Sequence, residues 1–237
     1  SLKEIEHLFM THQHMDHNAG FFHFVLLSWI YGRRSLSVYG PNSDNLIDAL
    51  ELVYEEDIAW REKVGRPTTG VTDIEAEGVI ETVRSDEGKW EVTSHEVDHS
   101  VETYAYRVED LQTGATVVYS ADTSKISSLA EFARGADILI QNCGVGPALD
   151  EPEFVNDTDR ISWEQYLEAN REPNETPIRE QHCNPHEAAS IAEEADVETV
   201  VLTHILPGRD IEQFRATVED EFSGEVYIGE DGLTLEA

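Results

Sequence analysis

The sequence predicts an α/β protein, because short β-rich runs alternate with helical stretches along much of its length. The runs over residues 116–120, 137–140 and 199–203 are rich in Val, Ile, Leu and Thr, which is typical of strands in an α/β context. The clearest helix spans residues 44–64, where apolar side chains recur every three or four positions. Another helix is predicted over residues 185–195.

The first third of the chain supplies three more elements. Residues 6–11 and 35–39 predict short strands, and the apolar residues 18–32 between them predict a helix that ends at a glycine. Asp44 is the expected N-cap of the helix over residues 44–64, and Gly65 ends that helix.

The rest of the chain contains three kinds of segment, namely strand-like runs, a helix and an acidic insert. Residues 71–108 consist of short strand-like runs, and the later helix over residues 185–195 opens with a capping-box pattern. Residues 150–181 are acidic and interrupted by prolines, which predicts an insert with at most one helix, around residues 163–170. This insert is either a lid, with Trp163 and Tyr166 as contacts, or a solvated surface loop.

The composition is strongly acidic. The 237 residues include 49 acidic and 16 basic side chains, which gives a formal net charge of −33. The acids recur along the whole chain and only four bases are lysines, a pattern similar to that of proteins from salt-loving organisms. An ordinary acidic protein is the alternative. Such a charge opposes binding of a polyanion at low salt.

No feature of the sequence indicates a membrane or an export signal. No apolar run reaches the ~18–20 residues that a membrane span needs, and the N-terminus shows no signal peptide. The two cysteines, Cys143 and Cys183, stand far from any CxxC spacing, which favours a reducing compartment. We therefore expect a cytoplasmic protein.

The most informative segment is Thr11–His17 (THQHMDH), which places three imidazoles and a carboxylate between a predicted strand and a predicted helix. His12 and His14 are two positions apart in extended chain and therefore project to the same side. Asp16 and His17 lie in the turn that enters the helix. Imidazole and carboxylate together suit zinc, manganese or iron, so the segment predicts a metal site. A histidine-rich surface loop is the alternative.

This HxHxDH pattern resembles the metallo-β-lactamase superfamily, and the resemblance extends over almost the whole chain. His99 in EVDHS is similar to the third-motif histidine, Asp122 in SADTS to the carboxylate that bridges two metals, and His204 in LTHILP to the last histidine. Asp122 and His204 each end a β-rich run, and strand ends gather the site in α/β sheets. His95 is a rival to His99, but the segment around it fits the family pattern less well.

The resemblance implies an αββα sandwich, a single domain over residues 1–237 and two divalent metals, zinc first with manganese or iron as alternatives. The ligands that it implies are His12, His14 and His99 for one metal, Asp16, His17 and His204 for the other, and Asp122 as the bridge.

A further histidine places the chain within the superfamily. The run HCNPHEA, which begins at His182, is similar to a stretch of the ribonuclease Z and phosphodiesterase branch, which includes arylsulfatase-like relatives. Asn184 stands where that branch has Ser or Thr, a change that a helix cap tolerates. The resemblance implies that His182 stabilises or protonates the leaving oxygen, and we expect Asp16 and His182 to be the catalytic residues. A plain loop histidine is the alternative for His182.

The resemblance implies hydrolysis of phosphodiester bonds by a metal-bridging hydroxide. The ribonuclease Z family carries a tRNA-binding arm between its third-motif histidine and its bridging aspartate, but only 22 residues separate His99 from Asp122. Together with the net charge, this predicts a small-molecule ester as substrate and makes nucleic acid an unexpected partner. Two alternatives stay open, namely a sulfatase or lactonase using the same site and a non-catalytic metal- or partner-binding remnant.

The chain starts eleven residues before His12, whereas the family has a strand-forming segment of a few dozen residues before its motif. We therefore expect the N-terminal strands of the sandwich to be missing. An exposed sheet edge is a pairing surface, which predicts a homodimer.

Overall fold

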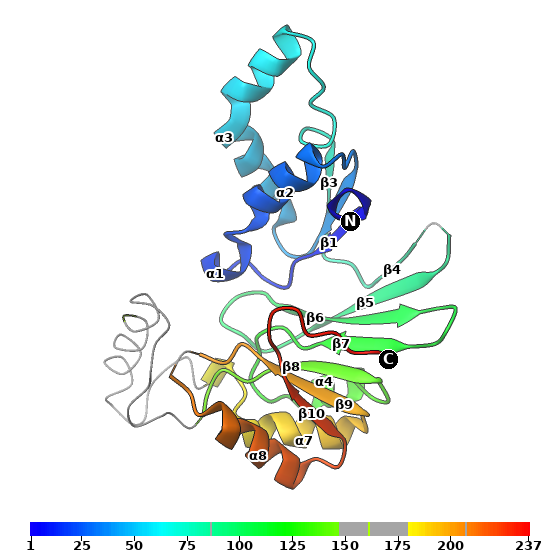
Figure 1. Ribbon diagram of the computed structural model, residues 1–237, viewed down its shortest axis with the longest axis vertical. Helices are drawn as coiled ribbons and strands as arrows, with labels where there is room; N and C mark the ends of the chain where they lie inside the picture. Colours follow the sequence, from blue (N-terminus) through cyan, green and yellow to red (C-terminus); the bar gives the residue numbers. More distant parts are fainter. Residues whose placement is uncertain (86, 147–160, 162–179, 207) are drawn as a thin grey trace. The chain divides into compact units, whose positions relative to one another are not determined.

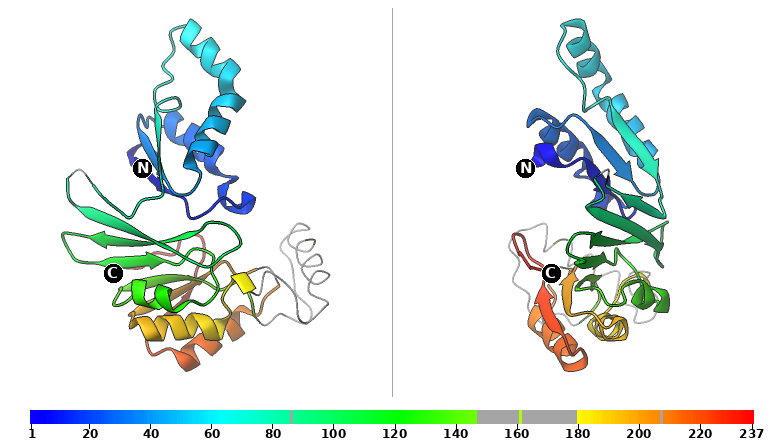
Figure 2. Two further views of the ribbon diagram at one scale, coloured as in Figure 1. Left: turned by 180° about the vertical axis from the view of Figure 1, so that it is seen from behind. Right: turned by 90° about the vertical axis from the view of Figure 1, so that its right-hand side faces the viewer.

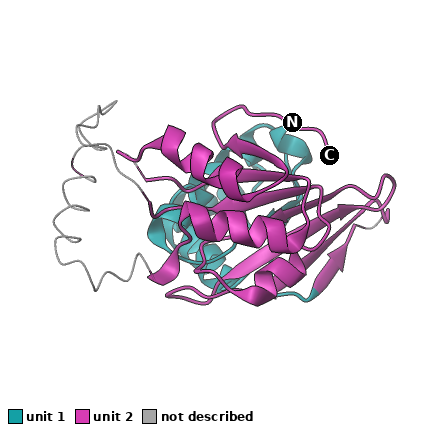
Figure 3. Ribbon diagram, turned by 90° about the horizontal axis from the view of Figure 1, so that it is seen from below, with its two compact units in different colours: residues 1–81 teal, residues 82–237 magenta. Residues whose placement is uncertain are grey.

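The structure is a computed structural model that describes residues 1–85, 87–146, 161, 180–206 and 208–237. The chain divides into two compact units, Ser1–Glu81 and Thr82–Ala237 (Figure 3). Nearly all of the expected insert, including its helix over residues 163–170 and the side chains of Trp163 and Tyr166, lies outside the described residues.

The first unit contains a three-stranded parallel sheet in the order β1-β2-β3. Its elements are the 3₁₀ turn η1 (Leu2–Glu4), β1 (His7–Phe9), α1 (Met15–Asn18), α2 (Phe21–Ile30), β2 (Leu36–Tyr39), α3 (Ser43–Lys63) and β3 (Ile74–Gly78) (Figure 1). Leu36 and Val38 alternate along β2 and so share one face of the sheet. They belong to one buried cluster with Val25 of α2 and Leu50 of α3, so both helices cover that face.

The second unit contains a seven-stranded sheet in the order β10-β9-β8-β7-β6-β5-β4 (Figure 2). Its elements are β4 (Thr82–Arg84), β5 (Trp90–Glu96), β6 (Tyr104–Asp110), β7 (Thr116–Tyr119), α4 (Ser127–Phe132), β8 (Ile138–Asn142), α7 (Pro185–Ala195), β9 (Thr199–Thr203), α8 (Ile211–Glu221) and β10 (Glu225–Ile228). The strands β7, β8, β9 and β10 pair in parallel, while β4 to β7 pair antiparallel.

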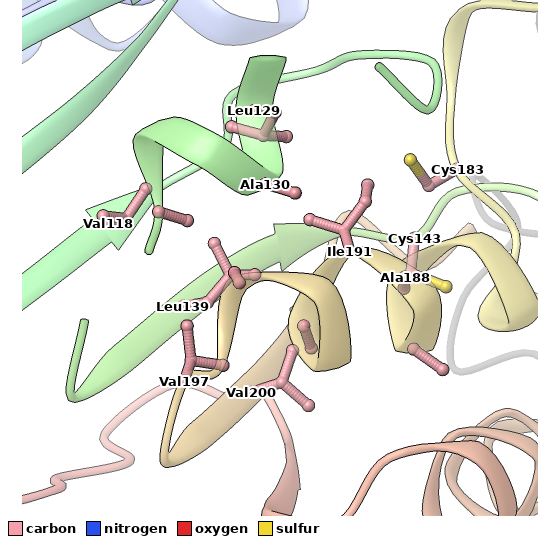
Figure 4. Packing of buried hydrophobic residues seen from close by; sticks show 14 of the residues in the cluster. Val118, Leu129, Ala130, Leu139, Cys143, Cys183, Ala188, Ile191, Val197 and Val200 are labelled. Atoms are coloured by element: carbon pink, nitrogen blue, oxygen red, sulfur yellow. The ribbon is translucent and has the colours of Figure 1, made fainter. Parts of the chain in front are cut away.

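One face of the parallel strands carries the main core of this unit (Figure 4). Val118 of β7 and Leu139 of β8 are fully buried, and they cluster with Leu129 of α4 and Ile191 of α7. Phe214 of α8 belongs to the same cluster. Each unit thus consists of one sheet with helices on one face, and the prediction of an α/β protein is confirmed.

Most predicted elements are confirmed within two residues of their expected bounds, with two differences. The helix expected over residues 18–32 is shorter, since α2 spans Phe21–Ile30 and a separate short helix, α1, ends at Asn18. The expected N-cap Asp44 was wrong, since α3 begins one residue earlier, after Asn42 in the left-handed conformation (φ 54°). Asparagine tolerates this conformation better than most residues. Among the described residues, no helix combines the length and the apolar character needed to cross a membrane.

Arg33 is the largest fully buried side chain among the described residues, and it links three parts of the first unit. Its Nε donates to the Ser28 hydroxyl at 2.8 Å, and its Nη1 donates to the Ser35 carbonyl at 3.1 Å. Its Nη2 donates to the carbonyls of Val25 at 3.3 Å and Gly70 at 2.9 Å. Burial lowers the pKa of this guanidinium, but these acceptors solvate its charge inside the unit.

Replacing Arg33 should therefore destabilise the first unit. In Arg33→Met the apolar stem remains, but the buried acceptors lose their donor, at a cost of about 1–3 kcal/mol for each group left unsatisfied. Arg34→Met is the matched control, because Arg34 is exposed and, within the described part of the chain, its side chain donates to the carbonyls of Trp29 and Arg33. Thermal unfolding followed by circular dichroism should show a clear fall in Tm for Arg33→Met alone. Equal shifts in both variants would contradict the structural role of Arg33.

Candidate metal centre

The second unit gathers polar side chains at the carboxyl ends of three of its parallel strands, β7, β8 and β9. Asp122 follows β7, Asn142 ends β8 and His204 follows β9. Because the three strands run in parallel and in register, their carboxyl ends lie at the same edge of the sheet. The strands themselves are apolar and the residues at their carboxyl ends are polar, so these polar side chains lie together at one edge of the sheet.

Asp122 and His204 are in direct contact. The His204 Nε2 lies 3.2 Å from an Asp122 carboxylate oxygen, and Asp122 is only 2% exposed. Ala121 and His204 both have left-handed backbone conformations, with φ of 58° and 57°. Non-glycine residues rarely adopt this region, and such strain concentrates at functional sites. The chain therefore accepts local strain at both turns that present these two side chains.

His99 and His182 complete the cluster of the second unit. Ligand atoms of His99, Asp122 and His182 all lie within 4.8 Å of one another. The His182 ring stacks on the His204 ring at a centroid distance of 5.0 Å and meets the His99 ring edge-on at 5.2 Å. His182 therefore lies next to His99, Asp122 and His204, the other three residues of this unit that the sequence predicted for the site.

The hydrogen bond of His99 fixes which of its nitrogens can bind a metal. Its Nδ1 lies 3.2 Å from the Gln181 carbonyl oxygen, which can only accept, so Nδ1 carries the proton. The lone pair of the neutral ring is then on Nε2, as in most metal-binding histidines. The rival His95 lies on β5 and stacks against Phe132 at 5.0 Å, so its placement does not favour a ligand role.

The first unit brings the rings of its histidine motif together. The ring of His12 lies at centroid distances of 4.8 Å from His14 and 4.3 Å from His17. A carboxylate oxygen of Asp16 lies 3.4 Å from the His17 Nε2, and the side chain of Asp16 is exposed. The Thr11 hydroxyl lies 3.0 Å from the His12 Nδ1, and where this hydroxyl accepts from Nδ1, the lone pair of the neutral His12 ring is on Nε2.

Two features of the first unit hold this loop in place. The Gln13 amide donates to the Pro41 carbonyl at 2.7 Å and accepts from Asn18 at 2.9 Å. Gly40 has a φ of 118°, and a Cβ at this position would lie 2.1 Å from the Met10 carbonyl oxygen. Only glycine therefore allows the turn after β2 to approach the end of β1, where the histidine loop begins.

The donor atoms of both units fit a divalent metal. Imidazole nitrogens and carboxylate oxygens are the ligands that zinc, manganese and iron take, and they occur here without a thiolate. Burial raises the pKa of Cys143 and of Cys183, so both thiols stay protonated. Burial, with a contribution from the Asp122 charge, also raises the pKa of Tyr119.

The sequence analysis missed Asn142. Its amide nitrogen lies 3.2 Å from an Asp122 carboxylate oxygen and 2.7 Å from the His182 Nδ1. The sequence around a single asparagine at the end of a β-rich run does not indicate a functional role for it. Only the strand register shows that it lies beside two residues from distant parts of the chain.

Comparison with known proteins extends these observations. A family model described as "Beta-lactamase superfamily domain" matches residues 1–205. A putative ribonuclease Z from Mycobacterium tuberculosis (strain CDC 1551 / Oshkosh) is 27% identical over 235 residues, which cover 94% of this chain and 96% of that protein. A ribonuclease Z from Methanopyrus kandleri is 27% identical over 251 residues, which cover 99% of this chain and 80% of that protein.

A solved structure supports the same fold. The metallo-beta-lactamase fold protein YhfI from Bacillus subtilis superposes with a TM-score of 0.70 and 23% identity, over 99% of this chain and 79% of that one. The match of the family model confirms the superfamily resemblance inferred from the motifs.

These comparisons correct one expectation. A small-molecule ester as substrate, with nucleic acid as an unexpected partner, was wrong, because curated relatives that span almost the whole chain are named ribonuclease Z. The physical reason is that the net charge of −33 is a sum over the whole molecule. It does not describe the field at a site where bound cations are the largest local charges.

The fold, the histidine and aspartate clusters and the family match all agree. This chain belongs to the metallo-β-lactamase superfamily and is a metal-dependent hydrolase.

Proposed function

We propose that this protein is a dinuclear phosphodiesterase that cleaves RNA. The observation that carries the proposal is the grouping of His99, Asp122 and His182 at the carboxyl edge of the sheet, with ligand atoms within 4.8 Å of one another. Relatives named ribonuclease Z support RNA as the substrate class.

The proposed ligand set is the one that the family resemblance implies, with zinc as the preferred metal. The proposed ligands are His12, His14 and His99 for one metal, Asp16, His17 and His204 for the other, and Asp122 between them.

Two divalent metals, when bound, would neutralise charge on the scissile phosphodiester and provide a nucleophilic water at neutral pH. The protein contributes the orientation of the ligands and the movement of protons. Asp16 is an exposed carboxylate that accepts the proton of the attacking water. His182 donates a hydrogen bond to the leaving oxygen as negative charge develops there. Buried strand ends hold Asp122 in place, so little reorganisation is needed during the reaction.

The direct test is hydrolysis by the full chain after reconstitution with zinc or manganese. A 5′-labelled precursor tRNA transcript should be cut at a discrete position, and a chelator should abolish the reaction. A nitrophenyl phosphodiester, a nitrophenyl sulfate and a lactone are the comparison substrates. Turnover of the sulfate or the lactone, with RNA left intact by a metal-loaded sample, would overturn the proposal.

Substitutions should separate the ligands from the hydrogen-bond donor. Asp122→Ala should lose bound metal and all turnover, because the proposed bridge is removed. His182→Ala should keep its metal but lose rate, on the order of 10²–10³-fold for the loss of one donor to a developing oxyanion. Metal content by elemental analysis and turnover are measured on the same samples, and Asp122→Asn serves if Asp122→Ala fails to fold. Loss of metal in His182→Ala would show that His182 is a ligand.

Salt should affect RNA cleavage in the opposite way to that seen with basic RNA-binding proteins. Raising the salt concentration from about 0.1 M to about 1 M shortens the screening length from ~10 Å to ~3 Å. This weakens repulsion between RNA and a chain of net charge −33. The KM for RNA should fall or stay level, whereas counterion release makes affinity fall with salt for basic proteins. The KM for a singly charged nitrophenyl phosphodiester is the control, and a steep rise of the RNA KM with salt would contradict this prediction.

A further inference from the structure

We infer that Asn142 is a positioning residue that fixes His182 with its proton on Nε2. In this tautomer neither ring nitrogen offers a lone pair to a metal, and Nε2 presents an N–H group. The inference deepens the proposed function, because only that proposal makes a leaving alkoxide oxygen the acceptor of this N–H group.

The orientation of the Asn142 amide follows from its three partners. The backbone N–H of Cys183, which can only donate, lies 3.1 Å from the Asn142 Oδ1. The amide nitrogen faces Asp122 and His182, and an ionised carboxylate can only accept. Cys183 and Asp122 therefore require the same orientation of the amide, with its oxygen toward Cys183 and its NH₂ group toward Asp122 and His182.

This orientation determines the tautomer of His182. The Asn142 NH₂ group has two hydrogens, one for Asp122 at 3.2 Å and one for the His182 Nδ1 at 2.7 Å. The Nδ1 must accept, so the single proton of the neutral ring is on Nε2.

The two histidines beside Asp122 therefore differ in chemistry although their rings lie only 5.2 Å apart. A carbonyl oxygen accepts from the Nδ1 of His99 and leaves a lone pair on its Nε2. An amide NH₂ group donates to the Nδ1 of His182 and leaves a proton on its Nε2. His99 is thus prepared as a ligand and His182 as a hydrogen-bond donor.

The fold holds Asn142 rigidly enough for this task. Asn142 ends β8, is 1% exposed, and donates its backbone N–H to the Ser120 hydroxyl at 2.9 Å. Gly144 packs close to the two rings, since a Cβ there would lie 3.4 Å from the His182 Cγ and 3.3 Å from the His204 Nδ1. The His182 ring consequently has little room to turn away from the amide.

The first test reads the tautomer directly, without any turnover. Long-range ¹H–¹⁵N spectra of the chelator-treated full chain distinguish a proton on Nε2 from a proton on Nδ1. The ten histidines of the chain require an assignment, which comes from the resonances lost in His182→Gln. We expect the neutral ring of His182 to carry its proton on Nε2, whereas that of His99 carries it on Nδ1. A proton on the Nδ1 of His182 would overturn the inference.

The second test reverses the hydrogen bond. In Asn142→Asp the new carboxylate can only accept, so the His182 proton should move to Nδ1. Asn184→Asp is the matched control, because it makes the same change at a helix cap where aspartate serves equally well. Asn142→Leu, which removes the hydrogen bond without adding charge beside Asp122, should give a mixture of both tautomers. If both Asn142 variants keep the wild-type tautomer, Asn142 does not fix the ring.

A kinetic readout separates positioning from a merely structural role. Asn142→Asp should lose kcat on RNA by on the order of 10²-fold or more with little change in KM, because negative charge gathers on the leaving alkoxide oxygen and the Nε2–H hydrogen bond stabilises it. The loss should be much smaller for a nitrophenyl phosphodiester, whose leaving group delocalises its charge. Equal losses on both substrates would contradict hydrogen bonding by His182 to the leaving oxygen. If RNA is not a substrate but the tautomer is as stated, the proposed function fails and the inference about Asn142 stands.

Discussion

The parallel pairing of β7, β8 and β9 is the constraint on which the site of the second unit depends. The register joins Val118 to Leu139 and Leu139 to Val200, and all three side chains are fully buried. Because apolar packing against the helices fixes this register, the positions of the residues just beyond the strands are fixed too. A slip of one strand would bury polar side chains and separate Asp122 from its partners.

The same constraint explains why strain is tolerated at Ala121 and His204. A residue in the left-handed region costs of order 1–3 kcal/mol and persists only where the surrounding structure determines it. Here the Ser120 hydroxyl donates to the Ala121 carbonyl at 2.7 Å and accepts from the backbone of Asn142 at 2.9 Å. The turn after β7 is thus tied to the end of β8, so the sheet holds the strained backbone that presents Asp122.

Local sequence signals predicted the parts of the structure that depend on neighbours in the chain. The helix α7 begins as expected, with Asn184 and Glu187 forming a reciprocal capping box, because all the atoms involved lie within four residues. The N-cap of α3 was placed wrongly because the left-handed conformation of Asn42 depends on how the preceding turn meets β1 and β3. The candidate metal-binding motif could be recognised because its residues stand close together in the sequence, and the more distant candidate ligands required a family pattern.

Asn142 could not have been predicted in this way. Its role depends on Asp122 and His182, which lie 20 and 40 residues away in the chain. No periodicity or spacing connects these three positions before the strands are paired. Positions that orient a reactive group through a hydrogen bond are therefore harder to find in a sequence than the reactive group itself.

The acidic composition led to the wrong prediction of a small-molecule substrate, because net charge, like local sequence, does not describe the arrangement of residues at the site. The acids of α3, such as Glu51, Glu55 and Glu56, are exposed and belong to the surface of the first unit. The second-unit cluster instead stands on strand ends and is oriented by backbone groups and buried amides. Surface charge and site geometry therefore rest on different residues and can vary independently. The net charge therefore does not predict the substrate, whereas the hydrogen bonds around His99 and His182 indicate which ring nitrogens carry protons.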